Sequence, residues 1–286
     1  MSIPMLPSRF SVPKFCQRLC LGSIFGFILA GAQLWCLPVC LPAWAGSLAE
    51  IEARGQLVVA VKDNWRPMGF RTDAGQLRGL EISLARRLAE ELLGDPEAVV
   101  FQPVSNQLRL RVVMDGEVDL AIAGVTATES RARVVSFSSP YYLDGVTFVT
   151  SDAALQNLEN LANRTVALLD GSSTLAAMRY FLPEAQLVGV ESYPAAIALL
   201  EAGEADVFAA DASILAGWVQ EFPRYRLLPF QLSVEPLCVV MPKGLQYDEL
   251  RRRVQGAIDG WEAEGWLREQ AAYWGLPIPS DSSIVN

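Results

Sequence analysis

The feature that most constrains the fold of this chain is a regular alternation of short apolar runs with longer amphipathic ones. In residues 81–93, for example, Ile82, Ala85, Leu88, Ala89 and Leu92 recur at helical spacing. Runs typical of buried strands occupy 56–61, 99–102, 120–123, 165–168, 187–190, 206–209 and 237–241. Runs typical of helices occupy 81–93, 108–114, 174–180, 195–200, 214–220, 248–258 and 261–273. The pattern predicts an α/β chain with buried parallel strands, in which ligands bind at the strand-to-helix loops.

The first 45 residues differ in composition from the rest. Three basic residues and no acidic one accompany an apolar run at 19–41, and the small-x-small sequence Ala43-Trp44-Ala45 follows. This order predicts a secretory signal peptide over residues 1–45, cleaved near Ala45-Gly46, and therefore a periplasmic protein. A retained membrane anchor is the alternative, because the apolar run is long enough to span a bilayer.

The composition excludes several kinds of chemistry. The chain contains no histidine, which removes imidazole bases, Ser-His-Asp catalysis and His-ligated zinc. Past the leader, 20 basic residues face 32 acidic ones, a net charge of −12 that argues against binding nucleic acid or anionic membranes. Cys238 is the one cysteine that remains there, so no internal disulfide forms. We expect a monomer with no cofactor, no metal and no catalytic residue.

Residues 119–142 carry the most information about function. A buried strand at 120–123 opens at Gly124 into Val-Thr-Ala-Thr, Arg131 follows, and then comes Phe-Ser-Ser-Pro-Tyr-Tyr. Backbone N–H groups at a strand end, a hydroxyl and a guanidinium together suit a carboxylate, because the planar fork of Arg meets both carboxylate oxygens. The stretch predicts a carboxylate-binding site.

These residues resemble the extracytoplasmic solute-binding proteins of amino-acid importers, of the family-3 type. The resemblance spans nearly all of the chain past the leader and rests on Gly55–Val61, Gly69-Phe70, Gly79–Ile82, Gly116–Leu120, the Gly-x-Thr-x-Thr-x-x-Arg motif at 124–131 and 137–142. It implies a two-lobed periplasmic-binding-protein type II fold, each lobe a mostly parallel sheet flanked by helices, with the ligand between the lobes. The expected division is 46–149 plus 235–286 for lobe 1 and 150–234 for lobe 2, with crossings near 148–152 and 232–237.

The resemblance also implies which residues hold the head group of an amino acid. Gly124 and Thr126 would offer backbone and hydroxyl contacts, and Arg131 would take the α-carboxylate. In lobe 2, Ser172 and Ser173 belong to a loop whose N–H groups would hold the same carboxylate at a helix N-terminus. Asp211 would receive the α-ammonium. A zwitterion that leaves water needs both partners, because an unpaired buried charge is costly.

The side chain of the ligand would meet a second set of residues. Members that bind glutamate or aspartate resemble this chain in having cations at the positions of Lys62 and Arg109, while Tyr193 could add a hydroxyl and Trp65 a wall. Alternatives remain for each: Arg109 could be a solvated helix residue, Lys62 could pair with Asp63, and Trp65 could pack beneath the site. We expect glutamate or aspartate as ligand, delivered to an ABC-transporter permease, with a neutral polar amino acid such as glutamine as the alternative.

Two other functions stay open at this point. An enzyme of the same fold, such as a dehydratase, would need a general acid or base, for which Asp63, Glu129 and Asp211 are the candidates. The chain could also report its ligand to a membrane receptor as a sensing partner.

Overall fold

The structure is a computed structural model that describes residues 46–170, 172 and 174–278. The predicted signal peptide therefore lies outside the described residues. Within them, no helix is both long enough and apolar enough to cross a membrane.

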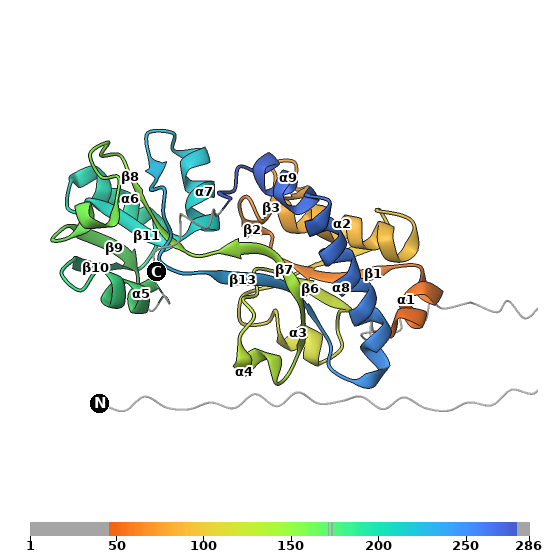
Figure 1. Ribbon diagram of the computed structural model, residues 1–286. Coiled ribbons are helices and arrows are strands. Elements are labelled where there is room, and N and C mark those ends of the chain that lie inside the picture. The colour runs from red at the N-terminus through yellow and green to blue at the C-terminus, as the bar shows by residue number, and fades with distance from the viewer. Residues whose placement is uncertain (1–45, 171, 173, 279–286) are drawn as a thin grey trace, which may run out of the picture. The chain divides into compact units, whose positions relative to one another are not determined.

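The first sheet has five strands in the order β5-β1-β6-β13-β7. Its strands are β1 (Leu57–Val61), β5 (Val99–Pro103), β6 (Leu120–Ile122), β7 (Ser136–Asp144) and β13 (Glu235–Met241). β5, β1 and β6 are parallel, whereas β13 lies antiparallel between β6 and β7, beside which it runs in Figure 1. All residues of β1 and β6 are buried, as expected for strands with both faces covered.

Helices and a small second layer surround this sheet. They are α1 (Leu48–Arg54), α2 (Leu80–Leu93), α3 (Arg111–Met114), α4 (Glu129–Ala132), α8 (Asp248–Ala263), α9 (Trp266–Tyr273) and the short 3-10 helix η2 (Leu245–Tyr247). A three-stranded sheet, β2-β3-β4, comprises Asn64–Trp65, Gly69–Arg71 and Leu77–Arg78. Side chains of β1 alternate between two cores: Val59 packs with α2 and α8, and Val58 packs with Val112 and Val113 of α3.

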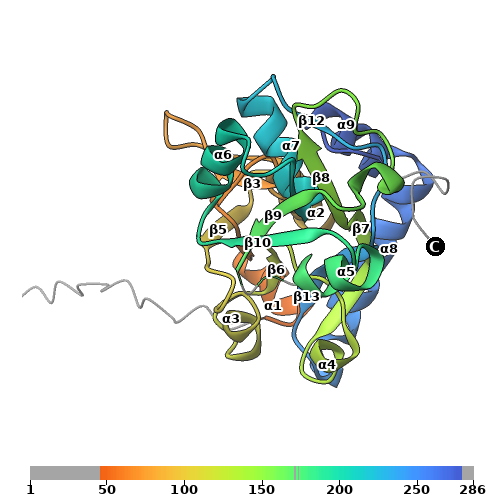
Figure 2. The ribbon, with the colours of Figure 1, turned by 90° about the vertical axis from the view of Figure 1, so that its left-hand side faces the viewer.

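The second sheet also has five strands, in the order β10-β9-β11-β8-β12. Its strands are β8 (Val146–Thr150), β9 (Thr165–Leu169), β10 (Gln186–Val190), β11 (Val207–Asp211) and β12 (Arg226–Leu227), and its helices are η1 (Leu158–Leu161), α5 (Thr174–Phe181), α6 (Tyr193–Ala202) and α7 (Ala212–Glu221). α5 contributes Met178 to the core on one face, and α6 contributes Ala196 to the core on the other. Figure 2 shows these two helices on either side of β9 and β10.

Each sheet contains two parallel and two antiparallel strand pairs, so both are more mixed than the mostly parallel sheets that the sequence predicted. The reason lies in β7, β8 and β13, which no crossover helix connects to a parallel neighbour. β8 and most of β13 are as fully buried as the parallel strands β1 and β6, so burial alone does not reveal their direction.

The chain changes sheet at Gly145. β7 ends at Asp144 in the first sheet and β8 begins at Val146 in the second, where the sequence placed residues 146–149 in lobe 1. No turn signal marks the change, because the backbone passes through Gly145 as part of one extended run. A Cβ on Gly145 would lie 1.9 Å from the carbonyl oxygen of Ser233, on the returning segment. The lobe boundaries stay a prediction, with this first crossing moved to Gly145.

Two helices begin later than predicted. α3 begins at Arg111, so Arg109 lies in the turn before it and not in a helix. Trp261 belongs to α8, which runs to Ala263, and α9 begins after Gly265, whose φ of 83° breaks the helix. The buried side chain of Trp261 continues the apolar face of α8, and this explains why the two helices meet further along the chain.

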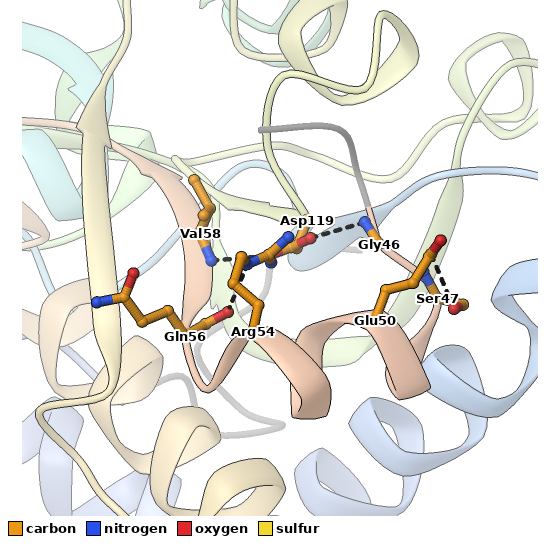
Figure 3. A network of polar contacts seen from close by, with 7 residues as sticks. All are labelled: Gly46, Ser47, Glu50, Arg54, Gln56, Val58 and Asp119. Carbon is orange, nitrogen blue, oxygen red and sulfur yellow. Dashed lines mark hydrogen bonds and ion pairs between the residues drawn. The ribbon is translucent and has the colours of Figure 1, made fainter. Parts of the chain in front are cut away.

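A buried carboxylate fixes the start of β6, the strand that leads to Gly124. Asp119 is 1% exposed and accepts hydrogen bonds from the N–H groups of Gly46 at 2.9 Å and Val58 at 2.8 Å. It also pairs with Arg54, at the end of α1 (Figure 3). Because an unpaired buried charge would be costly, these contacts hold α1, β1 and β6 in one arrangement.

Candidate functional site

A cavity of about 840 Å³ lies where loops of both sheets meet. We call it the central cavity. From the first sheet and its loops it is lined by Lys62, Asn64, Trp65, Arg66, Asn106, Arg109, Gly124, Thr126, Thr128, Arg131, Asp144, Glu235 and Leu237. From the second sheet it is lined by Tyr193, Pro194, Ile197, Asp211, Ile214, Gly217, Trp218, Glu221 and Phe222. Eight of the ten predicted site residues line it.

Gly124 lies just after β6, which ends at Ile122, in a conformation that favours glycine. Its φ is +63°, and a Cβ there would lie 1.9 Å from a ring carbon of Trp65. The indole therefore packs directly against the backbone of the loop, and Trp65 both lines the cavity and contacts the core beneath it. The Gly124 N–H donates to the carboxylate of Glu81 at 2.7 Å, which fixes the direction of this peptide.

Arg131 is held against the same loop. Its Nη1 donates to the carbonyl oxygen of Thr126 at 2.8 Å, and its backbone N–H donates to the Thr128 side chain at 3.3 Å. Thr126 is bridged to Leu237 of β13, and its hydroxyl donates to Glu235 at 3.4 Å. One carbonyl contact leaves the remaining donors of the guanidinium fork for a ligand in the cavity.

Lys62 and Arg109 form a second positive wall. Lys62 is 7% exposed, and its ammonium donates to the Val104 carbonyl at 3.2 Å. Arg109 donates from Nη1 to the carbonyl of Ala123 at 2.8 Å and also to that of Gly124. Burial lowers the pKa of both groups, and repulsion adds to it, from Arg109 in the case of Lys62 and from Arg131 in the case of Arg109.

These contacts decide two of the alternatives that the sequence left open. Arg109 is a cavity residue and not a solvated helix residue. Lys62 does not pair with Asp63, whose carboxylate bonds to Arg71.

Three carboxylates also line the cavity, Asp211 from the second sheet and Asp144 and Glu235 from the first. Asp211 ends β11, and burial, followed by the charges of Asp144 and Glu235, raises its pKa to about 7. Asp144 accepts hydrogen bonds from the N–H groups of Gly145 at 2.9 Å and Ser213 at 3.1 Å, yet burial still raises its pKa to about 6. Glu235 lies opposite Asp144 in the β7–β13 ladder. Three acids crowded in this way disfavour one another's charge, and a ligand cation would relieve that repulsion.

The remaining predicted site residues differ in whether they line the central cavity. Tyr193 lines the cavity and stacks edge-on against Phe208, and burial, followed by the charge of Asp211, raises the pKa of its phenol to about 12. Ser172 is not among the described residues that line the cavity, and its hydroxyl oxygen is buried without a partner among them. Ser173 lies outside the described residues.

Sequence reasoning missed Asp144, Glu235 and Glu81. The first two sit at the ends of the strands where the chain passes between the sheets, so only their pairing across β7 and β13 brings them together. Glu81 reads as an ordinary first-turn helix residue, because glutamate is common there. One signal could have found it, since the amphipathic pattern of 81–93 places Glu81 beside Ile82 and Ala85 near the buried face.

The arrangement suits a ligand that carries both charges. Arg131 offers donors to an anion, while Asp211 and Glu235 offer acceptors to a cation in the same cavity. The predicted contacts from Gly124 and Thr126 are already used within the protein, because the Gly124 N–H donates to Glu81 and the Thr126 hydroxyl donates to Glu235. Among the described residues, no group of three or more acidic or cysteine side chains has a geometry that could hold a metal ion.

Comparisons with known proteins agree on one family. The model of the bacterial extracellular solute-binding proteins, family 3, matches residues 57–277. A glutamine-binding protein of Geobacillus stearothermophilus is 31% identical over 68% of this chain and 75% of its own length. The glutamate-binding protein GluB of Corynebacterium efficiens is 26% identical over 67% of each chain.

Two further relatives bear on the chemistry. Cyclohexadienyl dehydratase of Pseudomonas aeruginosa is 27% identical over 82% of this chain and 88% of its own. The solved structure of an ancestral cationic amino acid solute-binding protein, AncCDT-1, has a TM-score of 0.69 at 27% identity, and the match covers 80% of this chain and 100% of that one. The fold is thus shared by binding proteins and by an enzyme.

Proposed function

This chain belongs to the bacterial extracellular solute-binding proteins of family 3, and on that premise we propose that it captures a polar L-amino acid, glutamate or aspartate in the first place, and delivers it to the permease of an ABC importer. The observation that carries the proposal is the opposition of charges in the central cavity. Arg131 would bind the α-carboxylate, and Asp211 with Glu235 would bind the α-ammonium. Each charge of a zwitterion would gain a partner when it leaves water.

Lys62 and Arg109 support an acidic side chain on the ligand. Both are cations that line the central cavity, Lys62 buried and Arg109 half-buried, and each retains donors beyond its backbone contacts. Burial, followed by repulsion from a neighbouring cation, lowers the pKa of each group, and a second carboxylate on the ligand would favour their charged forms.

Glutamine is the second candidate ligand, and a specific observation favours it. The relative that is 31% identical is named for glutamine, while the one named for glutamate is 26% identical. A carboxamide oxygen could accept from Lys62 or Arg109, although it would leave their charges uncompensated.

A dehydratase is the alternative in the enzyme class, favoured by the cyclohexadienyl dehydratase relative. Of its three candidate acids, Asp211 lines the central cavity, while Asp63 bonds to Arg71 and Glu129 lies exposed at the start of α4. A binding protein needs only the ammonium partner that Asp211 supplies, so the binding function requires fewer assumptions. Incubation with candidate cyclic acids and amino acids, followed by mass spectrometry, separates the two, and recovery of converted product would overturn the binding proposal.

Export through a cleaved leader completes the proposal. N-terminal sequencing of the protein from the periplasm should begin at Gly46, and a chain that keeps residues 1–45 would support the anchored form instead.

The ligand is tested by isothermal titration calorimetry against all twenty L-amino acids. We expect the tightest binding for glutamate or aspartate, followed by glutamine. Tightest binding of a neutral or basic amino acid, glutamine included, would refute the assignment of Lys62 and Arg109 to a second carboxylate.

A further inference from the structure

A fully buried carboxyl group lies directly behind the wall of the central cavity. Glu81, in the first turn of α2, is 0% exposed and does not line the cavity itself. Its Oε1 accepts hydrogen bonds from the Gly124 N–H at 2.7 Å and from the Tyr141 hydroxyl at 2.6 Å. Its Oε2 is buried and has no hydrogen-bond partner among the described residues.

The two cations of the proposed side-chain subsite act on this carboxyl group. Lys62 follows β1, Arg109 precedes α3, and the charges of both favour the ionised form of Glu81. In return, the Glu81 charge favours the charged forms of Lys62 and Arg109. The subsite therefore contains two cations at the cavity surface and one concealed acid behind them.

We propose that Glu81 is a specificity-determining residue, whose ionisation sets the net charge of the Lys62–Arg109 subsite and thereby the preference between a carboxylate and a carboxamide side chain on the ligand. This inference rests on the proposed function, since it assumes that the cavity binds an amino acid. Glu81 acts through the field at the subsite and through the Gly124 peptide, and it does not touch the ligand.

The direction in which Glu81 changes the preference between the two ligands follows from charge alone. When Glu81 is ionised it offsets part of the positive charge, so a neutral carboxamide competes well with a carboxylate. When Glu81 is protonated the subsite becomes more positive, and a carboxylate gains. Burial raises the pKa of Glu81 to about 7, against the hydrogen bonds from Tyr141 and Gly124, so the change falls within the physiological range.

The groups that face Glu81 come from four elements. They are the Tyr141 hydroxyl on β7, the Gly124 N–H at the end of β6, the Lys62 ammonium after β1 and the Arg109 guanidinium before α3. The pKa of Tyr141 is raised well above its ordinary value by burial, followed by the charge of Glu81, so its phenol stays protonated at neutral pH. Glu81, with a pKa of about 7, therefore titrates between pH 6 and 8.

The test measures the ratio of the binding constants for L-glutamate and L-glutamine by calorimetry from pH 6 to pH 8. Both ligands share the same head group, so its contribution to binding, including the effect of the titration of Asp211, cancels in the ratio. We expect the ratio to fall as the pH rises, by on the order of tenfold, the size of one unit charge acting through a protein interior. A ratio that stays constant would overturn the inference.

The variant Glu81→Gln keeps an acceptor for Gly124 and Tyr141 and removes the charge. We expect its ratio to remain at the high, low-pH value throughout. Tyr141→Phe is the matched control, because it removes a donor from the same oxygen and leaves the carboxyl group, so its ratio should still vary with pH. If Glu81 served only to support the fold, Glu81→Gln would weaken the binding of both ligands equally and the ratio would keep its pH dependence.

A measurement on the unaltered protein keeps the inference testable if Glu81→Gln fails to fold. Titration at pH 7 in two buffers of different ionisation enthalpy gives the protons taken up on binding. Glutamate should take up more protons than glutamine, because the ligand carboxylate raises the pKa of Glu81 further. Equal uptake would overturn the inference alone, whereas no binding of either ligand would refute the proposed function and this inference with it.

Discussion

The pH dependence of binding tests the assignment of Asp211 to the ligand ammonium. Burial and the neighbouring charges of Asp144 and Glu235 raise the pKa of Asp211 to about 7. An ammonium beside the carboxylate would favour its charged form and lower that pKa. Binding therefore releases a proton below about pH 7, and affinity must rise with pH until Asp211 is fully ionised.

The size of the change in affinity follows from the pKa of Asp211. For a group of pKa about 7 that is ionised in the complex, affinity drops by about tenfold between pH 8 and pH 6, which corresponds to about 1.4 kcal/mol. L-Glutamine is the suitable ligand, because its neutral side chain reduces any contribution from Glu81. The window ends at pH 6, since Asp144, with a pKa of about 6, is half protonated there and its own contribution grows as the pH falls further.

The assay is calorimetric titration at half-unit steps from pH 6 to pH 8. The variant Asp211→Asn should bind more weakly at pH 8 and lose the pH dependence. Asp73→Asn, at an exposed turn position, changes the net charge by the same amount and should leave the profile intact. Affinity that is constant from pH 6 to 8, or a dependence that persists in Asp211→Asn, would refute the reasoning.

Further predictions concern the binding of the ligand carboxylate by Arg131 and the effect of site residues on the stability of the fold. Arg131→Ala should weaken binding by about 2–5 kcal/mol in titrations, since it leaves a buried carboxylate without its partner, and unchanged affinity would place the head group elsewhere. Gly124→Ala should destabilise the protein by roughly 1–3 kcal/mol in denaturant unfolding, because of its φ of +63° and the Cβ position 1.9 Å from the Trp65 ring. Gly256→Ala is the control, since a Cβ there meets nothing within 4 Å and alanine should be neutral or stabilising in α8; equal losses at both glycines would contradict the account. Asp211→Asn should raise the unfolding temperature of the ligand-free protein at pH 8 and not at pH 4. A buried acid of raised pKa stabilises the fold below its unfolded pKa and loses that contribution as the pH rises through about 7, so a lower unfolding temperature at pH 8 would contradict the assigned burial cost.

Much of the fold could be predicted from the sequence, because the α/β alternation is a local property. The strand at 57–61 and the helix at 80–93 follow from apolar spacing, and their bounds agree with the prediction to within one residue. The change of sheet at Gly145 could not be located in the same way, because a continuous extended run gives no turn signal. The direction of β8 and β13 could not be predicted either, since a buried strand has the same composition whichever way it runs.

The sequence likewise identified those site residues that are close together in the chain and missed those that are far apart. Gly124, Thr126 and Arg131 are close in sequence, so one motif identified them together, and all three line the central cavity. Asp144 and Glu235 are far apart in sequence and become neighbours only through the β7–β13 ladder. A single sequence contains no record of such a pairing.

The central claim is that the cavity holds both charges of an amino acid at once. Its most direct test is a titration with L-glutamate beside two analogues, glutarate, which lacks the α-amine, and 4-aminobutanoate, which lacks the α-carboxylate. The account predicts that each analogue binds at least about 30-fold more weakly than glutamate, since each leaves one side of the cavity with an unpaired charge, a loss of about 2 kcal/mol or more. Binding of either analogue as tightly as glutamate would contradict it.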